Sequence, residues 1–215
     1  MAPLKRFYPL ISCSLIMFSV VAIVVGQFDP DPYLDPMNVT ISEYAVADRG
    51  GVTEVAMVAM GLGSFVLLAA LRAAGAPIRG LPERLLMVWS GALIVAAIIP
   101  TTPIGMDMTL TAEIHRWVSV AAFVSLPAAG ALLVPRLAAD ERWKAVSRPV
   151  EWVALAGGLG LLAITYVALP GDRVMIGLVE RGLLAAEVAL LAVLAARLVR
   201  LQWVRATTAT LAPIS

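Results

Sequence analysis

The chain has 215 residues, of which 60% are hydrophobic and 14% are charged, and its formal net charge is +1. Soluble domains average about 45–50% apolar and about 25% charged residues, so this composition predicts an integral membrane protein with little room for a soluble domain. The near-neutral charge gives no reason to expect a nucleic-acid partner. Cys13 is the one cysteine, which excludes an intrachain disulfide and a paired-cysteine redox motif.

Long apolar runs follow one another along the chain. A spanning helix needs about 20 predominantly apolar residues, and a single segment in lipid has to satisfy its backbone polar groups internally, as a helix does. The third run, from Leu85 to Pro100, is short unless Thr101 to Ile104 extend it. We therefore predict an all-α, polytopic membrane protein, with a six-transmembrane-helix bundle as a single integral membrane domain over residues 1–215. The predicted helices span about residues 10–26, 54–71, 85–103, 114–134, 150–169 and 177–198, with an outer loop at 27–51.

Basic residues are distributed unequally between the two sides of this topology. If the N-terminus is inside, twelve of the 16 Lys and Arg residues fall on the inner side and four on the outer side. This is the bias of the positive-inside rule, so we predict that both termini are cytoplasmic. Trp143, Trp152 and Trp203 then fall near the inner interface, where an aromatic belt is expected.

The outer loop opens with three Asp-Pro pairs, which begin at Asp29, Asp31 and Asp35. Proline excludes helix at its own position and disfavours it at the preceding residue, so an extended segment is expected there. The three acids suggest calcium, but the Gly and the closing Glu of an EF-hand loop are not at the required positions. We therefore predict no metal site.

The fourth helix carries a polar stretch, Asp107 to Ser119, at its outer end. Glu113 and Arg116 are three residues apart and can form an ion pair. His115, the one histidine of the chain, is four residues from Ser119 and can hydrogen-bond to it on another side of the helix. An acid, an imidazole and a guanidinium are thus expected at the end of a membrane helix.

The sixth helix repeats this pattern with Glu180, Arg181 and Glu187. Glu180 and Glu187 are seven residues apart, so they share a helix face, and Glu187 lies about 10 Å deeper by the helical rise. Glu54 begins the second helix. Three helices therefore bring acids to the outer half of the membrane, and no inner-half position does so.

Ionisable side chains at membrane depth are costly and are functional candidates by default. Arg116 and Arg181 suit a phosphate or lipid headgroup, because the guanidinium fork matches phosphate geometry. His115 and Glu187 are the catalytic candidates, since either could move a proton. The alternative is that these charges pair with one another at the interface and only fix helix positions. The candidate ligand-binding residues are Glu43, Glu54, Asp107, Glu113, His115, Arg116, Glu180, Arg181 and Glu187.

Several cofactors are excluded by the residue types. A haem held between two helices needs more than one histidine, and a zinc hydrolase normally uses three protein ligands, usually including two or more His or Cys. A quinone or thiol redox enzyme would need a second cysteine. We therefore predict no cofactor.

Three short motifs resemble the DUF998 family of six-helix bacterial membrane proteins of unknown function. They are Ser42-Glu43-Tyr44 before the second helix, Pro100-Thr-Thr-Pro103 after the third and His115-Arg116 at the start of the fourth. The family pattern has an acid in the Pro-Thr-x-Pro turn, where this chain has Thr102, and Asp107 is a candidate to take its place. The layout is also similar to the Frag1/DRAM/Sfk1 group, which is linked to membrane lipid organisation. The resemblance implies a multi-pass protein of the bacterial inner membrane and favours a role related to lipid, by analogy of fold.

Three hypotheses of function follow. The leading one is a non-enzymatic membrane protein that binds a lipid headgroup, or another membrane protein, through the outer cluster. The second is a membrane-embedded enzyme acting on lipid or cell-envelope substrates, with His115 as base and the arginines holding phosphate. The third is a proton-coupled carrier with Glu187 as the titrating group, which is disfavoured because broken helices and an inverted repeat are not visible in the sequence.

Overall fold

A computed structural model describes residues 7–27, 34–47, 51–103 and 105–210, with the backbone alone for residues 204–210. These residues form helices and no strand. The elements are α1 (Tyr8–Gly26), α2 (Ile41–Ala47), α3 (Val52–Ala73), α4 (Leu81–Ile98), α5 (Leu110–Ala139), the 3-10 turn η2 (Lys144–Val146), α6 (Ser147–Ala168) and α7 (Ile176–Thr210). All but α2 and η2 are long and apolar enough to cross a membrane, so the prediction of an all-α protein with six membrane-spanning helices is confirmed.

The boundaries of two predicted segments differ from the structure. The third spanning helix begins at Leu81 and ends at Ile98, so its extra length comes from its start and not from Thr101 to Ile104. It begins early because Pro82 favours the first helical turn. It ends early because Ile99 precedes Pro100 and adopts the extended backbone that this position favours. In addition, part of the predicted outer loop forms α2; Asp29 and Asp31 lie outside the described residues.

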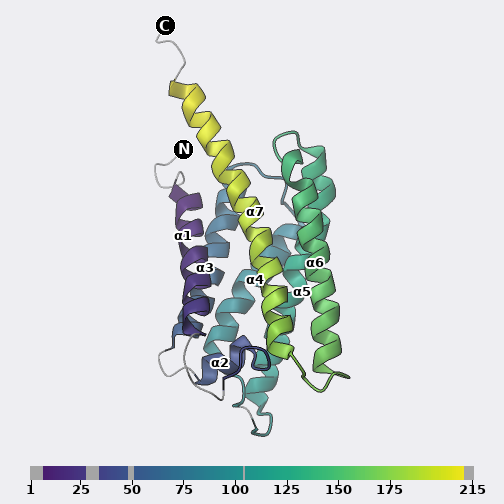
Figure 1. Cartoon of the computed structure of the whole chain (residues 1–215). Helices are drawn as coiled ribbons and strands as arrows, with labels where there is room; N and C mark the ends of the chain where they lie inside the picture. The colour runs from purple at the N-terminus through teal and green to yellow at the C-terminus, as the bar shows by residue number, and fades with distance from the viewer. Residues whose placement is uncertain (1–6, 28–33, 48–50, 104, 211–215) are drawn as a thin grey trace.

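The spanning helices pack in chain order. α1 lies against α3, α3 against α4, α4 against α5, and α5 against α6, while α7 packs on α6 and also contacts α1, α3 and α5 (Figure 1). The start of α1 and the end of α7 lie at one end of the bundle, and α2 lies at the other (Figure 1). These are called the termini end and the α2 end below.

Small residues allow the helices to approach closely. A Cβ on Gly61 of α3 would lie 2.6 Å from Ile94 Cγ1 on α4, and one on Gly63 would lie 3.0 Å from Leu15 Cβ on α1. Ser12 Oγ crosses the second of these contacts to donate to Gly63 O at 2.8 Å. Close packing and interhelical hydrogen bonds drive association between helices in lipid, where the hydrophobic effect contributes little.

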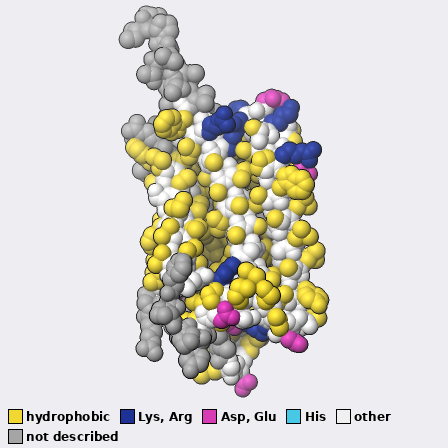
Figure 2. Space-filling view, viewed as in Figure 1, with side chains coloured by type: hydrophobic (Ala, Val, Ile, Leu, Met, Phe, Trp, Pro, Cys, Tyr) yellow, Lys and Arg dark blue, Asp and Glu magenta, His cyan; other side chains and the backbone are white. Residues whose placement is uncertain are grey.

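Basic side chains concentrate at the termini end (Figure 2). Several of them bind backbone carbonyl groups in the loops that join the helices. Arg142 donates to Gly75 O at 2.9 Å beyond the end of α3, and Arg197 of α7 donates to Arg142 O at 2.7 Å. Arg72 and Glu83 form an ion pair between α3 and α4. This end is therefore held by arginine contacts to the loops.

Candidate functional site beneath α2

The short helix α2 is formed by its own sequence. Thr40 precedes it, and both its N–H and its hydroxyl donate to Glu43 Oε2, at 2.9 and 2.8 Å. The Glu43 N–H in turn lies 3.2 Å from Thr40 Oγ1. This reciprocal pairing is a capping box, which satisfies donors that a helix start leaves free.

A turn ahead of α2 is closed by Asp35. Its carboxylate accepts hydrogen bonds from the Met37 N–H at 2.9 Å and from the Asn38 side-chain amide at 2.6 Å. These donors, the Met37 N–H first, hold the pKa of Asp35 below its ordinary value. The negative charge of Asp35 is thus used locally to fold the turn, and no metal is needed to explain it.

The turn and α2 dock onto the start of α7 through backbone contact. The Leu178 N–H donates to Met37 O at 3.1 Å, and the Met175 N–H donates to Asn38 Oδ1 at 3.0 Å. A Cβ on Gly177 would lie 2.5 Å from Pro36 O and would also collide with Val39 O. Only glycine therefore fits where this turn crosses α7.

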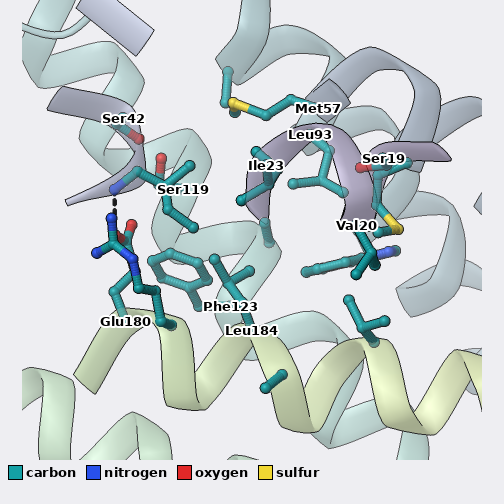
Figure 3. Close-up of a pocket in the computed structure, with 18 of the residues that line it drawn as sticks. Ser19, Val20, Ile23, Ser42, Met57, Leu93, Ser119, Phe123, Glu180 and Leu184 are labelled. Carbon is teal, nitrogen blue, oxygen red and sulfur yellow. Dashed lines mark hydrogen bonds between the residues drawn. The ribbon is translucent and has the colours of Figure 1, made fainter. Parts of the chain in front are cut away.

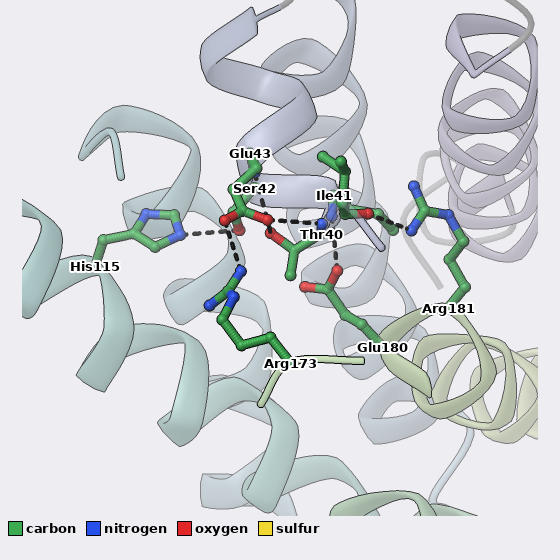
Figure 4. Close-up of polar contacts among 9 residues, drawn as sticks. Thr40, Ile41, Ser42, Glu43, His115, Arg173, Glu180 and Arg181 are labelled. Carbon is green, nitrogen blue, oxygen red and sulfur yellow. Dashed lines mark hydrogen bonds and ion pairs between the residues drawn. The ribbon is translucent and has the colours of Figure 1, made fainter. Parts of the chain in front are cut away.

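Three side chains from distant parts of the chain then bind α2 (Figure 4). Glu180 Oε2 of α7 accepts from the Ile41 N–H at 2.6 Å, and Arg173 Nη2, in the turn before α7, donates to Glu43 Oε1 at 2.6 Å. The third is His115 of α5, whose Nε2 lies 2.9 Å from Ser42 Oγ. A carboxylate at the first turn of a helix is favoured by the free N–H groups there. These bonds join α2 to α5, α7 and the turn between α6 and α7.

His115 is buried, with 6% of its surface exposed, and both ring nitrogens have partners. Nδ1 lies 2.6 Å from Ile99 O, which can only accept, so Nδ1 carries the proton. In the neutral ring Nε2 is then the acceptor for the Ser42 hydroxyl. The carbonyl of Ile99, freed where α4 ends, thereby fixes the tautomer and the orientation of the imidazole.

Arg181 is held without a carboxylate partner among the described residues. Its Nε donates to Gln27 Oε1 at 2.8 Å, and its Nη1 donates to Val39 O at 2.8 Å and to Gly177 O at 2.9 Å. Its guanidinium carbon lies 5.3 Å from the centroid of the Tyr44 ring. The remaining nitrogen, Nη2, is buried and has no hydrogen-bond partner. The side chain is fixed in place, yet the two N–H groups of Nη2 remain unused.

Two cavities adjoin α2. The first, of about 500 Å³, lies between α1, α3, α4, α5 and α7 and is almost entirely apolar (Figure 3). Its polar lining lies mostly at the α2 end, where it consists of Gln27, Ser42, Ser119, Glu180 and Arg181, and Ser19 of α1 lines it further along. Val24 of α1 and Ala185 of α7 both line it and are exposed, so it opens between these two helices. We call this the apolar cavity.

The second cavity, of about 800 Å³, lies between α2, the ends of α5 and α6, and the segment that joins α4 to α5. It is more polar and includes His115, Arg116 and Arg173. The two cavities share wall residues, namely Ser42, Ser119, Phe123 and Glu180. We call it the polar cavity.

The structure brings together four of the residues that the sequence singled out, Glu43, His115, Glu180 and Arg181, around α2. It does not bring Arg116 to Arg181, because the two arginines line different cavities. Arg116 pairs with Glu113 at 3.6 Å, and both side chains are half exposed.

No hydrogen bond or ion pair between described residues joins the other candidates to α2. Asp107 is exposed in the segment before α5. Glu54, in the first turn of α3, has a buried Oε2 without a hydrogen-bond partner. Glu187 is 1% exposed and lines neither cavity.

Sequence reasoning missed Ser42 and Arg173 as contacts of the site. A local signal existed for α2, since Thr40 and Glu43 have the spacing of a capping box. No local signal existed for Arg173, which is 130 residues from its partner Glu43.

Replacing Glu180 by alanine should release α2, because the buried Ile41 N–H is left without its acceptor, which costs about 1–3 kcal/mol. We expect amide hydrogen exchange in residues 40–47 to accelerate by about tenfold or more, since each 1.4 kcal/mol is a factor of ten. The control is Glu113→Ala, which removes an exposed acid that does not contact α2. Equal exchange in both variants would contradict the role assigned to Glu180.

Comparison with known proteins gives one match. Residues 13–197 match the family described as Protein of unknown function (DUF998). No curated protein and no solved structure matches the chain. The matched region runs from α1 into the second half of α7 and so includes α2 and every residue described above that contacts it. This protein therefore belongs to the DUF998 family, as its motifs indicated.

Proposed function

We propose that this protein binds one amphipathic membrane lipid, with an acyl chain in the apolar cavity and the headgroup at Arg181. We also propose that it resides in the inner membrane of a bacterium with the α2 end outside. The excess of Lys and Arg at the termini end supports that orientation, since basic residues favour the cytoplasmic side (Figure 2).

The observation that carries the proposal is the unused Nη2 of Arg181 at the polar end of the apolar cavity. A buried donor without an acceptor costs about 1–3 kcal/mol, and more when the group is charged. A phosphate or carboxylate oxygen of a headgroup would satisfy it with a charge-assisted hydrogen bond. The absence of a carboxylate partner for Arg181 among the described residues leaves its positive charge available for such an anion.

The shape and lining of the apolar cavity support an acyl chain as the other half of the ligand. Its volume of about 500 Å³ lies within the range of about 300–1,000 Å³ that is usual for small-molecule sites. Apolar cavities do not retain water and accept apolar guests. The opening between α1 and α7 faces the region that lipid chains occupy around a spanning bundle, so a chain can enter sideways without leaving the bilayer.

Native mass spectrometry of the purified protein, with phosphatidylglycerol added to the detergent micelles, tests the headgroup contact. Wild type should retain one lipid, and Arg181→Ala should retain it at least tenfold more weakly, because a charge-assisted hydrogen bond of about 1.5–3 kcal/mol is lost. Arg116→Ala is the control, since Arg116 lines the other cavity and is already paired with Glu113. Loss of lipid in the control alone, or in neither variant, would refute a headgroup site at Arg181.

A variant that fills the apolar cavity tests the acyl-chain contact separately from the headgroup contact in the same assay. Ala189 lines the apolar cavity, so Ala189→Phe should displace the chain while leaving Arg181 in place. Ala192, one turn further along α7, is exposed and lines neither cavity, which makes Ala192→Phe the matched control.

A second candidate function is hydrolysis of a lipid ester. Ser42 and His115 are within hydrogen-bond distance, and a third group, Ile99 O, orients the imidazole, which is the arrangement of an activated nucleophile. Ser42 also lines both cavities. The bond is equally explained by the docking of α2 onto α5, and binding remains our conclusion.

A fluorophosphonate probe distinguishes these two functions, because it labels a serine only when a neighbouring base activates it. For a lipid-binding protein we expect the probe to label wild type no more than it labels Ser42→Ala, the variant that lacks this serine. Labelling of Ser42 in wild type that disappears in His115→Gln would overturn this expectation and identify a hydrolase.

A further inference from the structure

Glu187 lies in the middle of α7, on the face formed with Leu183, Leu190 and Leu194, all of which are buried. Only 1% of its surface is exposed. Neither carboxyl oxygen has a hydrogen-bond partner, and both oxygens are buried. Neither the docking of α2 nor the lining of the two cavities accounts for an acid at this position.

The contacts on either side of Glu187 define its level in the bundle. One turn toward the α2 end, Leu183 packs on Gly160 of α6, where a Cβ would lie 3.0 Å from Leu183 Cδ1. One turn toward the termini end, Leu190 packs on Gly130 of α5. Between these levels, a Cβ on Gly157 of α6 would lie 2.9 Å from Pro127 Cγ of α5. Glu187 therefore stands where α5, α6 and α7 meet, at the level of Pro127.

This position is sealed. Glu187 lines neither cavity, and the neighbouring glycines of α5 and α6 leave no room even for a methyl group without displacement of a neighbour. A lipid, a metabolite or a hydrated ion does not fit there. The one ligand that such a carboxyl group can hold is a proton.

No cation among the described residues compensates a negative charge at Glu187. Its own helix carries Glu180 and Arg181 two turns away, and both are already bonded to the α2 segment. Between residues 117 and 134 of α5, and between 152 and 165 of α6, the sequence contains no ionisable side chain. The ionisable side chains of the other elements packed on α7 lie near its two ends or on α1; they are Tyr8, Cys13, Glu43, Tyr44, Glu54, Arg72 and Lys144. An unpaired carboxylate at this depth would be strongly destabilising.

Pro127 leaves a free backbone acceptor on α5 near the level of Glu187. Because proline has no N–H, the carbonyl of Phe123 lacks the donor that residue 127 would otherwise provide within α5. This carbonyl points along α5 toward the level of Pro127, where Glu187 lies. Backbone groups freed by proline in a membrane helix are satisfied by neighbouring helices or by side chains.

We propose that Glu187 is a proton-binding site, in which the uncharged acid donates a hydrogen bond from α7 to the Phe123 carbonyl at the proline break of α5. The site is separate from the lipid site, and neither depends on the other. Protonation of Glu187 would thus allow a contact between α5 and α7 in the middle of the bundle.

Infrared spectroscopy of the protein in lipid vesicles tests the protonation. Wild type should show the C=O stretch of a carboxylic acid that shifts on transfer to D₂O, and Glu187→Gln should lose this band. The band should persist in Glu180→Gln, which controls for the other buried acid of α7. Loss of a carboxylate band in Glu187→Gln, or failure of this neutral and isosteric variant to fold, would overturn the proposal.

A second variant tests the acceptor while keeping Glu187. Pro127→Ala restores an N–H for the Phe123 carbonyl, so the acid band of Glu187 should move to higher frequency as its hydrogen bond weakens. Pro135→Ala makes the same change two turns further along α5 and should leave the band unchanged. A band that is unaffected by Pro127→Ala would exclude the Phe123 carbonyl as the partner.

Discussion

Gly177 allows the backbone of the segment before α2 to lie directly on α7. A side chain at this position would collide with the carbonyl groups of Pro36 and Val39, and the turn could not reach its present place. The docking of this segment and of α2 onto α7 depends on this contact. With the turn in place, Glu180 meets the first turn of α2, and Arg181 meets Val39 O. Helix α7 therefore packs on the other spanning helices and also carries Glu180 and Arg181, which hold α2 and the segment before it.

Most buried nitrogen and oxygen atoms of charged side chains among the described residues have polar partners, and the exceptions belong to Glu54 in the first turn of α3, Arg181 and Glu187. At the termini end, arginines bind loop carbonyls and acids, and at the α2 end Arg173 and Glu43 pair. Within the spanning part, Arg181 retains a donor without an acceptor, and Glu187 retains two oxygens without a donor. The first lines a cavity that a lipid can enter, whereas the second is sealed. This difference in access is why we assign a lipid headgroup to one and a proton to the other.

The sequence alone was sufficient for the six spanning helices and for the family, because apolar runs and short motifs are local. It was less reliable where two local effects compete. The third helix was extended past Pro100, although the residue before a proline favours an extended backbone and Ile99 adopts it. The grouping of the site could not be predicted, because it depends on contacts between distant residues, such as His115 with Ser42 and Arg173 with Glu43. Arg116 and Arg181 were assigned to one phosphate site from residue type, yet their helices direct them to different cavities.

The most direct test of the lipid proposal is an experimental density map of the protein in lipid nanodiscs. We expect an elongated density in the cavity between α1 and α7, ending within hydrogen-bond distance of Arg181 Nη2, with α2 docked over it. A cavity that is collapsed or filled by side chains, with Arg181 Nη2 bonded to a carboxylate of the protein, would contradict the account.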